Sequence, residues 1–128
     1  DPAHVQHELV HGWFGRVGRK AFATCPITEN GLLRIAGHPK YPNSPGPPSA
    51  VAGALGSMRA LQGHQFWPDS ISLSDGSFAD AALLSSHTRV TDSYLLALAR
   101  ANKGQLATLD TKLVTEGVEQ GRSFLEVI

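Results

Sequence analysis

Several features are rare or missing in the sequence, and each such absence excludes some classes of protein. It has a single cysteine, Cys25, so the chain cannot form an internal disulfide, which fits a reducing compartment. No apolar run approaches the roughly 20 residues that a membrane-spanning helix needs, and the opening residues do not have the pattern of a signal peptide. We therefore expect a soluble cytoplasmic protein.

An excess of charge is also missing. Lysine and arginine together number 11, and aspartate and glutamate also number 11, so the chain as a whole has no electrostatic attraction to nucleic acid. Any contact with RNA would have to come from a local basic rim. The composition, 41% hydrophobic and 17% charged, is that of a globular protein, and 128 residues are enough for one core. We expect a single domain over residues 1–128.

Apolar spacing and turn residues divide the chain into alternating helices and strands. The predicted helices cover residues 2–17, 26–36, 50–62, 77–85 and 91–102. Asp1 and Pro2 start the first of them, Ser49 caps the third, and Lys103-Gly104 ends the last. The predicted strands are 21–25, 65–67, 71–73, 87–90, 106–109 and 124–128, and a proline-rich loop covers 37–48. This alternation favours an α/β layer fold with a mostly parallel sheet.

Three of these helices have apolar residues at helical spacing, which we expect to face inward. They are Val5, Leu9, Val10, Trp13, Phe14 and Val17 in the first helix, Ile27, Leu32, Leu33 and Ile35 in the second, and Tyr94, Leu95, Leu98 and Ala101 in the helix over 91–102.

Three acids follow three of the predicted strands. Glu29 comes shortly after 21–25, Asp92 after 87–90, and Asp110 directly after 106–109. The carboxyl ends of parallel strands meet at one rim of a sheet, so these carboxylates should converge there if the strands are neighbours. Each acid alone also has a structural explanation, in a first helical turn, a helix cap or a turn. Their joint placement is what favours a site.

A cluster of three carboxylates has a chemistry of its own. Like charges repel, so the cluster requires either a raised pKa or a cation. Oxygen ligands suit Mg²⁺ or Mn²⁺ better than zinc. Such an ion activates water and neutralises charge on a phosphoryl group, and two ions about 3.5–4 Å apart can serve both the attacking and the leaving oxygen. This pattern predicts a metal-dependent nuclease.

Three blocks of the sequence resemble the VapC-type PIN domain in composition, order and spacing. They are Cys25-Pro26-Ile27-Thr28-Glu29-Asn30-Gly31, Thr91-Asp92-Ser93-Tyr94-Leu95-Leu96-Ala97-Leu98-Ala99 and Leu106-Ala107-Thr108-Leu109-Asp110. The resemblance covers nearly the whole chain. It implies a three-layer α/β/α sandwich and a Mg²⁺- or Mn²⁺-dependent endoribonuclease toxin that leaves 5′-phosphate and 3′-hydroxyl ends. It also implies a homodimer that a cognate VapB-type antitoxin silences.

The resemblance assigns roles residue by residue. Glu29, Asp92 and Asp110 match the family's catalytic, metal-binding acids. Asn30 and Thr91 adjoin them and are candidates for orienting ligands or water. Arg34, slightly more than one helical turn after Glu29, is a candidate for contacting an RNA phosphate.

The sequence departs from the family pattern at its start. The family begins with a central strand that bears a further Asp, and nothing here corresponds to it, because Asp1-Pro2-Ala3-His4 resembles the loop that follows that strand. We expect that strand upstream of Asp1 or in another chain. Without it, a sheet would have a slot lined by unpaired backbone groups. A protein that starts at Asp1 should therefore cleave RNA poorly, and one extended upstream should cleave it better.

Two other functions remain open. His7-Glu8-Leu9-Val10-His11 fits the H-E-x-x-H pattern of zinc hydrolases, in which two histidines on one helix face bind zinc and the glutamate acts as base, with His4 on the same face. Surface histidines on a packing helix explain the same residues more simply. A chain that lacks one acid could also serve as a non-catalytic domain for dimerisation or antitoxin binding.

Overall fold

The computed structural model describes residues 2–128, with side chains from Val5 onward, and the chain forms two compact units. Unit 1 comprises Asp1–Gly12 and Ser70–Ile128, and unit 2 comprises Trp13–Asp69. Helix α1 (Pro2–Arg16) confirms the helix predicted over residues 2–17, whereas the capping role predicted for Asp1 lies outside the described residues. Both units contain helices and a pair of parallel strands, which confirms the predicted α/β class.

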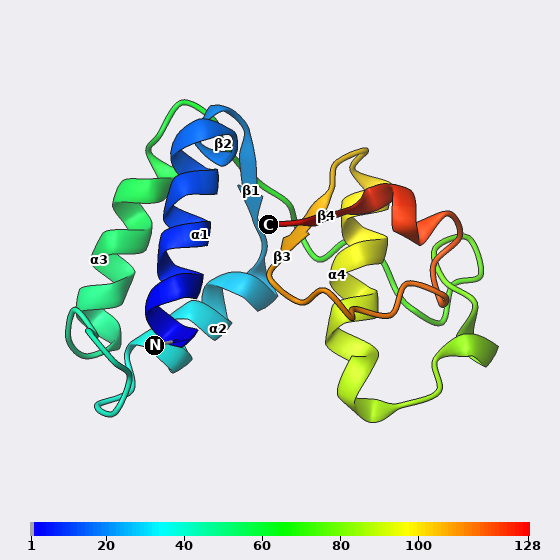
Figure 1. Ribbon diagram of the computed structural model, residues 1–128. Helices are drawn as coiled ribbons and strands as arrows, with labels where there is room; N and C mark the ends of the chain where they lie inside the picture. Colours follow the sequence, from blue (N-terminus) through cyan, green and yellow to red (C-terminus); the bar gives the residue numbers. More distant parts are fainter. Residues whose placement is uncertain (1) are drawn as a thin grey trace. The chain divides into compact units, whose positions relative to one another are not determined.

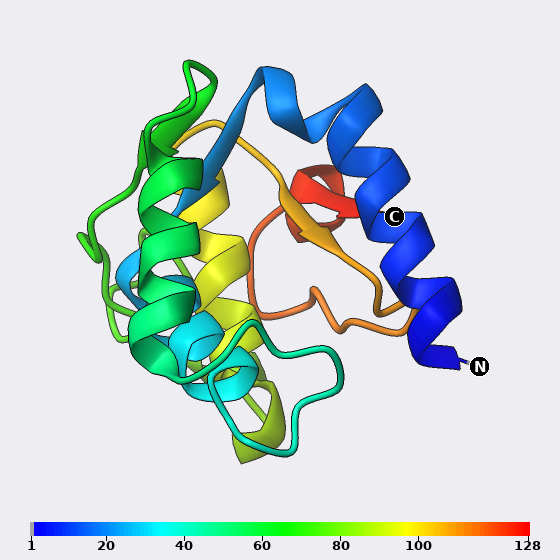
Figure 2. The same ribbon diagram turned by 90° about the vertical axis from the view of Figure 1, so that its left-hand side faces the viewer.

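Unit 2 is built on the parallel pair β1 (Phe22–Thr24) and β2 (His64–Phe66), in which Phe22 pairs with His64 and Thr24 with Phe66. Between them come α2 (Pro26–Ala36) and α3 (Pro48–Arg59), joined by the proline-rich loop that is drawn in teal in Figure 2. Each of these helices starts with a proline, which lacks the N–H that a first helical residue leaves unpaired.

The core of unit 2 is small. The side chains of Cys25, Ala36, Val51 and Leu55 are buried, and α2 packs on α3. The prediction that Ile27, Leu32 and Ile35 face inward is wrong, since they are 38%, 38% and 53% exposed. A sheet of two three-residue strands offers too little surface to cover a whole helix face.

Helix α3 also differs from its predicted bounds. It begins at Pro48, after the N-cap residue Pro47, so Ser49 lies inside the helix and not at its cap. It ends at Arg59, three residues before the predicted end at Gln62. This earlier end places the Arg59 side chain at the helix terminus, where the chain turns toward β2.

Unit 1 is built around helix α4 (Val90–Ala101) and the parallel pair β3 (Leu106–Thr108) and β4 (Leu125–Val127), which Figure 1 shows in yellow, orange and red. Leu96, Ala97 and Val118 form its buried core. Ile71, Leu73, Leu106, Phe124 and Leu125 pack against that core. Leu98 and Ala99 are buried as well, so α4 is covered on most sides at Leu96–Ala99. The helix and its inward residue Leu98 are as predicted, whereas Ala101, also predicted to face inward, is exposed.

Three extended or helical segments predicted for unit 1 are wrong. Residues 71–73 form no strand, residues 77–85 contain only the short 3-10 helix Ala81–Leu83, and residues 87–90 form the 3-10 helix His87–Arg89 followed by the start of α4. Local side-chain bonds explain the last two. Asp80 Oδ1 accepts a hydrogen bond from the Ala82 N–H, and Ser86 Oγ accepts one from the Thr88 N–H, which starts a tight turn in each case.

Helix α1 has a more exposed apolar surface than its pattern predicts. Val5, Leu9, Val10 and Val17 are between 37% and 54% exposed, while Trp13 and Phe14 are half-buried. None of the helices in the described part of the chain is both long and apolar enough to cross a membrane.

Candidate functional site

Glu29 is placed by the transition from β1 into α2. After the strand ends at Thr24, Cys25 takes the N-cap position, and the Thr28 hydroxyl accepts a 3.0 Å hydrogen bond from the Cys25 N–H. The Glu29 N–H donates to the Cys25 carbonyl at 2.9 Å, which closes the first helical turn. Glu29 thus lies in the first turn of a helix that directly follows a strand, and its predicted placement is confirmed.

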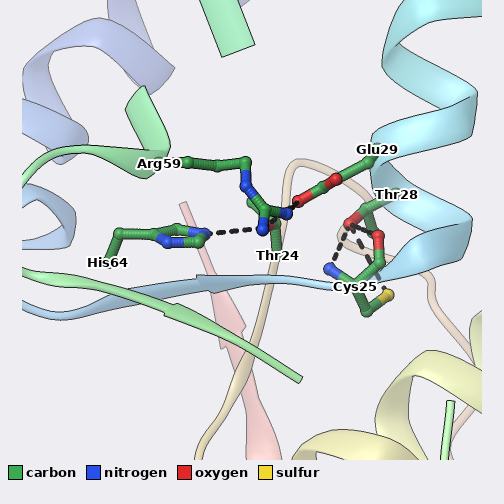
Figure 3. A network of polar contacts seen from close by, with 6 residues as sticks. All are labelled: Thr24, Cys25, Thr28, Glu29, Arg59 and His64. Carbon is green, nitrogen blue, oxygen red and sulfur yellow. Dashed lines mark hydrogen bonds and ion pairs between the residues drawn. The ribbon is translucent and has the colours of Figure 1, made fainter. Parts of the chain in front are cut away.

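The Glu29 carboxylate is held by a polar network, shown in Figure 3. Thr24 Oγ1 donates to Glu29 Oε2 at 2.6 Å, and Arg59 Nη1 lies 2.5 Å from the same oxygen. His64 Nε2 lies 2.7 Å from Thr24 Oγ1. Since the single hydroxyl proton of Thr24 goes to the carboxylate, His64 must donate to Thr24, which assigns its proton to Nε2.

This network changes the acidity of the Glu29 carboxyl. Partial burial acts to raise the pKa of the carboxyl, but hydrogen bonds from Thr24 and Arg59, together with the positive charges of Arg59 and His64, outweigh it and lower the pKa below its ordinary value of 4.5. Glu29, which is ionised at neutral pH like any glutamate, therefore stays ionised to lower pH than a free side chain. Both hydrogen bonds go to Oε2, so the carboxylate is also fixed in orientation.

Arg59 has a second contact that orients it. Its guanidinium carbon lies 4.7 Å from the centre of the Phe66 ring, a cation–π geometry. The Arg59 side chain is 40% exposed and the Glu29 side chain 16% exposed. The pair therefore lies at the surface of unit 2, with the carboxylate on the inner side.

The other two predicted acids belong to unit 1. Asp92 lies half-buried in the first turn of α4, where the helix dipole favours negative charge. It does not follow a strand, because residues 87–90 are helical. Asp110 is exposed, one residue beyond the strand-flanking Leu109, and its Oδ1 accepts a 2.8 Å hydrogen bond from the Lys112 N–H. Its predicted turn is confirmed.

The three residues expected to orient ligands or to contact RNA all lie on exposed helix surfaces. Asn30 is in α2 next to Glu29, and Thr91 is in the first turn of α4 next to Asp92. Arg34 is in the last turn of α2, beside a surface hollow that Ile35, His38, Lys40, Tyr41 and Pro42 also line. Within the part of each unit that the structure describes, no three His, Cys, Asp or Glu side chains come together as a metal site.

Sequence reasoning missed Thr24, Arg59 and His64. Thr24 ends the Phe-Ala-Thr strand just as Thr108 ends the Leu-Ala-Thr strand, so the repeated Ala-Thr before a predicted acid was a signal that could have identified it. Arg59 and His64 had no such signal, because they lie 30 and 35 residues after Glu29 in the sequence and reach it only through the fold.

The two histidines of the H-E-x-x-H motif, His7 and His11, lie on one face of α1. The rings of His7 and His11 are 5.5 Å apart between centroids, tilted by 34°. This matches the helical spacing on which the zinc interpretation depends, although a pair of neighbouring surface histidines has the same geometry.

The chain is similar in sequence to several proteins named as ribonucleases. No family model matches the chain. Ribonuclease VapC39 of Mycobacterium tuberculosis is 39% identical over 112 residues, which cover 88% of this chain and 81% of the relative. Ribonuclease VapC44 of the same organism is 36% identical over 121 residues, covering 92% and 82%. Ribonuclease VapC38 is 33% identical over 131 residues, covering 98% and 87%.

Proposed function

The chain belongs to the VapC family of ribonucleases, and from this membership we propose that it is an endoribonuclease toxin that requires Mg²⁺ or Mn²⁺. The observation that supports the proposal most directly is the ionised, oriented carboxylate of Glu29. The proposal treats residues 1–128 as one PIN-like domain in which Glu29, Asp92 and Asp110 converge at one site. A cognate VapB-type antitoxin and a homodimer belong to the same proposal.

The donor set fits a hard divalent cation. All three proposed ligands are carboxylates, and oxygen donors of this kind select Mg²⁺ or Mn²⁺ over softer metals. The bound ion would lower the pKa of water and neutralise charge on the scissile phosphate. The protein's own contribution is to hold Oε2 of Glu29 through Thr24 and Arg59, which leaves its second oxygen, Oε1, outside both hydrogen bonds and in a fixed direction. Asn30 and Thr91 are proposed to orient ligands or water.

The test is cleavage of RNA together with metal binding. We expect Mn²⁺- or Mg²⁺-dependent cleavage that a chelator stops. Replacement of one ligand, as in Asp92→Asn, Glu29→Gln or Asp110→Asn, should lower cleavage at least about 100-fold, because even the residues that merely orient metal ligands cost 10–100-fold when changed. Glu116→Gln removes an exposed acid of unit 1 outside the proposed site and should have no effect.

A titration with Mn²⁺ gives a readout that does not depend on the rate of cleavage. We expect binding to weaken in the three ligand variants and to be unchanged in Glu116→Gln. The same measurements on a protein extended upstream by the strand predicted above would show whether that strand strengthens the site. If neither protein cleaved RNA while both bound antitoxin, the non-catalytic alternative would be correct.

The zinc alternative has its own outcome. Zinc bound at one ion per chain, and lost on His7→Ala, would support a site on α1. Among the described side chains, His7 and His11 supply two such ligands on one helix face, and the side chain of His4 lies outside the described residues.

A further inference from the structure

The end of helix α3 supplies a cation directly to the proposed catalytic carboxylate. Arg59 is 30 residues from Glu29 in the sequence, yet its Nη1 lies 2.5 Å from Glu29 Oε2. On the basis of the proposed function, we propose that Arg59, and not Arg34, is the residue that binds the scissile RNA phosphate beside Glu29.

The position of Arg59 is suited to this role. The guanidinium carbon of Arg59 lies 4.7 Å from the centre of the Phe66 ring, a contact that restricts the planar group in addition to its bond with Glu29 (Figure 3 shows its approach to Glu29). A guanidinium has five N–H donors in a fixed fork, and the contact with Glu29 is made by Nη1. Because the side chain is 40% exposed, the rest of the fork can bind a phosphate from solvent.

The charges explain how one arginine serves both groups. Without a metal ion, Arg59 is the counterion of Glu29 and shares Oε2 with Thr24. A divalent cation held by Glu29 would offset the charge of the same carboxylate and would thereby weaken its ion pair with Arg59. The guanidinium of Arg59 would then be available to an RNA phosphate beside Glu29. The metal ion and Arg59 would thus compete for the Glu29 carboxylate, while both would attract the RNA phosphate.

Arg34 does not have these contacts. It lies in the last turn of α2, whereas Glu29 lies in the first, and it borders the hollow lined by His38 and Tyr41. Its five-residue separation from Glu29 turns it to another side of the helix. The resemblance made it a candidate by proximity in sequence alone.

The experiment compares four variants: Arg59→Met, Arg59→Lys, Arg34→Met and, as a control for loss of one positive charge, Arg16→Met. Mn²⁺ binding is measured without RNA. Binding of a labelled oligoribonucleotide is then measured in an Asp92→Asn background, which suppresses cleavage, at Mn²⁺ concentrations that saturate the weakened metal binding of that variant. Thermal unfolding confirms that each variant is folded, and Arg59→Lys, which keeps the charge, serves if Arg59→Met does not fold.

Arg59→Met should tighten Mn²⁺ binding about 3- to 10-fold, because it removes a competing cation. It should weaken RNA binding about 10-fold, since a charge-assisted bond to phosphate is lost. Arg59→Lys should leave Mn²⁺ binding unchanged and weaken RNA binding about 3-fold, because the planar fork is lost. Arg34→Met and Arg16→Met should change neither by more than about 2-fold.

Two results would overturn the inference. If Arg34→Met, and not Arg59→Met, weakened RNA binding, Arg34 would have the role. If Arg59→Met weakened Mn²⁺ and RNA binding in parallel, Arg59 would only orient Glu29. Failure of the proposed function is a different result: wild-type protein would then show no metal-dependent cleavage, whatever residue occupies position 59.

Discussion

The first strands of the two units differ by one residue, yet their ends are organised differently. Phe22-Ala23-Thr24 is β1 and Leu106-Ala107-Thr108 is β3, and each pairs in parallel with a later strand. In unit 2, Thr24 Oγ1 bonds to two side chains, those of Glu29 and His64. In unit 1, Thr108 Oγ1 accepts a 3.0 Å bond from the backbone N–H of Asp110. The same strand sequence therefore supports a side-chain network in one unit and a backbone turn in the other.

The partner strands account for this difference. The residues opposite β1 are His64, Gln65 and Phe66, and those opposite β3 are Leu125, Glu126 and Val127, so the polar His64 of β2 stands where β4 has Leu125. Leu106 and Leu125 pack on the core around Leu96. Unit 1 is therefore stabilised by apolar packing that does not involve Asp92 or Asp110. In unit 2 the groups that hold the sheet end together also hold the proposed site, so stability and function are linked there.

The largest effect should come from the core of unit 1. Leu96 is 0% exposed, so Leu96→Ala should lower the free energy of unfolding by about 3 kcal/mol through lost burial and a cavity. Urea denaturation measures this. Leu32→Ala on α2, where the side chain is 38% exposed, is the matched control and should cost below about 1 kcal/mol. Equal losses would show that the surface of α2 is covered in solution.

The matched threonines test the comparison itself. Thr24→Val keeps the shape of the side chain but removes the hydroxyl between Glu29 and His64, and should cost about 1–2 kcal/mol because a bond to a charged group is lost. Thr108→Val removes one bond from an exposed backbone N–H and should cost about 0.5 kcal/mol. Urea denaturation of the two variants gives the difference directly.

Metal binding should also depend on the hydroxyl of Thr24. Thr24→Val frees Glu29 to change orientation and should weaken Mn²⁺ binding about 10-fold, as expected for loss of a group that positions a ligand. Thr24→Ser retains the hydroxyl and should restore binding. If Thr24→Val bound Mn²⁺ as wild-type protein does, the network would be structural and not part of the site.

The pH dependence of stability should also differ between the units. The pKa of Glu29 is lowered in the folded protein, so this group contributes stability above its ordinary pKa of 4.5, and the contribution is lost as the pH falls through the folded pKa. Glu29→Gln should therefore remove part of the decrease in unfolding free energy between about pH 6 and pH 3. Urea denaturation across this range provides the measurement.

Asp110→Asn is the control for that prediction. Asp110 is exposed and bonds only within its own turn, so its removal should leave the acid-dependent decrease nearly unchanged. An equal change in both variants would mean that general charge, and not the contacts of Thr24 and Arg59, determines the acid response.

Much of the fold was predictable because its signals are local. Pro26 and the apolar spacing after it predicted the bounds of α2, and the short apolar runs predicted β1, β3 and β4 within one or two residues. The strand predicted over residues 87–90 failed because Ser86 bonds to the Thr88 backbone, and this local bond outweighs the extended preference of the segment.

The candidate site was predictable only in part, for a related reason. Glu29 and Asp110 follow strands in the sequence, so their placement could be read from it. The cation that neutralises Glu29 could not, because Arg59 is brought there by the packing of α3 on α2 and by the length of α3. Charge pairs that join distant segments leave no periodic pattern in a sequence.

The smallest effect concerns how helix α4 ends. The Gly104 N–H donates to the Ala99 carbonyl, and the Lys103 N–H to that of Arg100, as in a Schellman motif. This motif requires a left-handed residue, and that residue is Lys103, with φ of 58°, and not the glycine that the sequence led us to expect. Lys103→Gly should raise the free energy of unfolding by about 0.5–1 kcal/mol, since the strain of the side chain exceeds the added flexibility of glycine when unfolded. Asn43 in unit 2 has nearly the same φ, 57°, but asparagine tolerates it, so Asn43→Gly should change stability by less than about 0.5 kcal/mol. If Asn43→Gly stabilised the protein as much as Lys103→Gly, the left-handed backbone would be strained equally for asparagine and for lysine, and the difference in residue type would not matter.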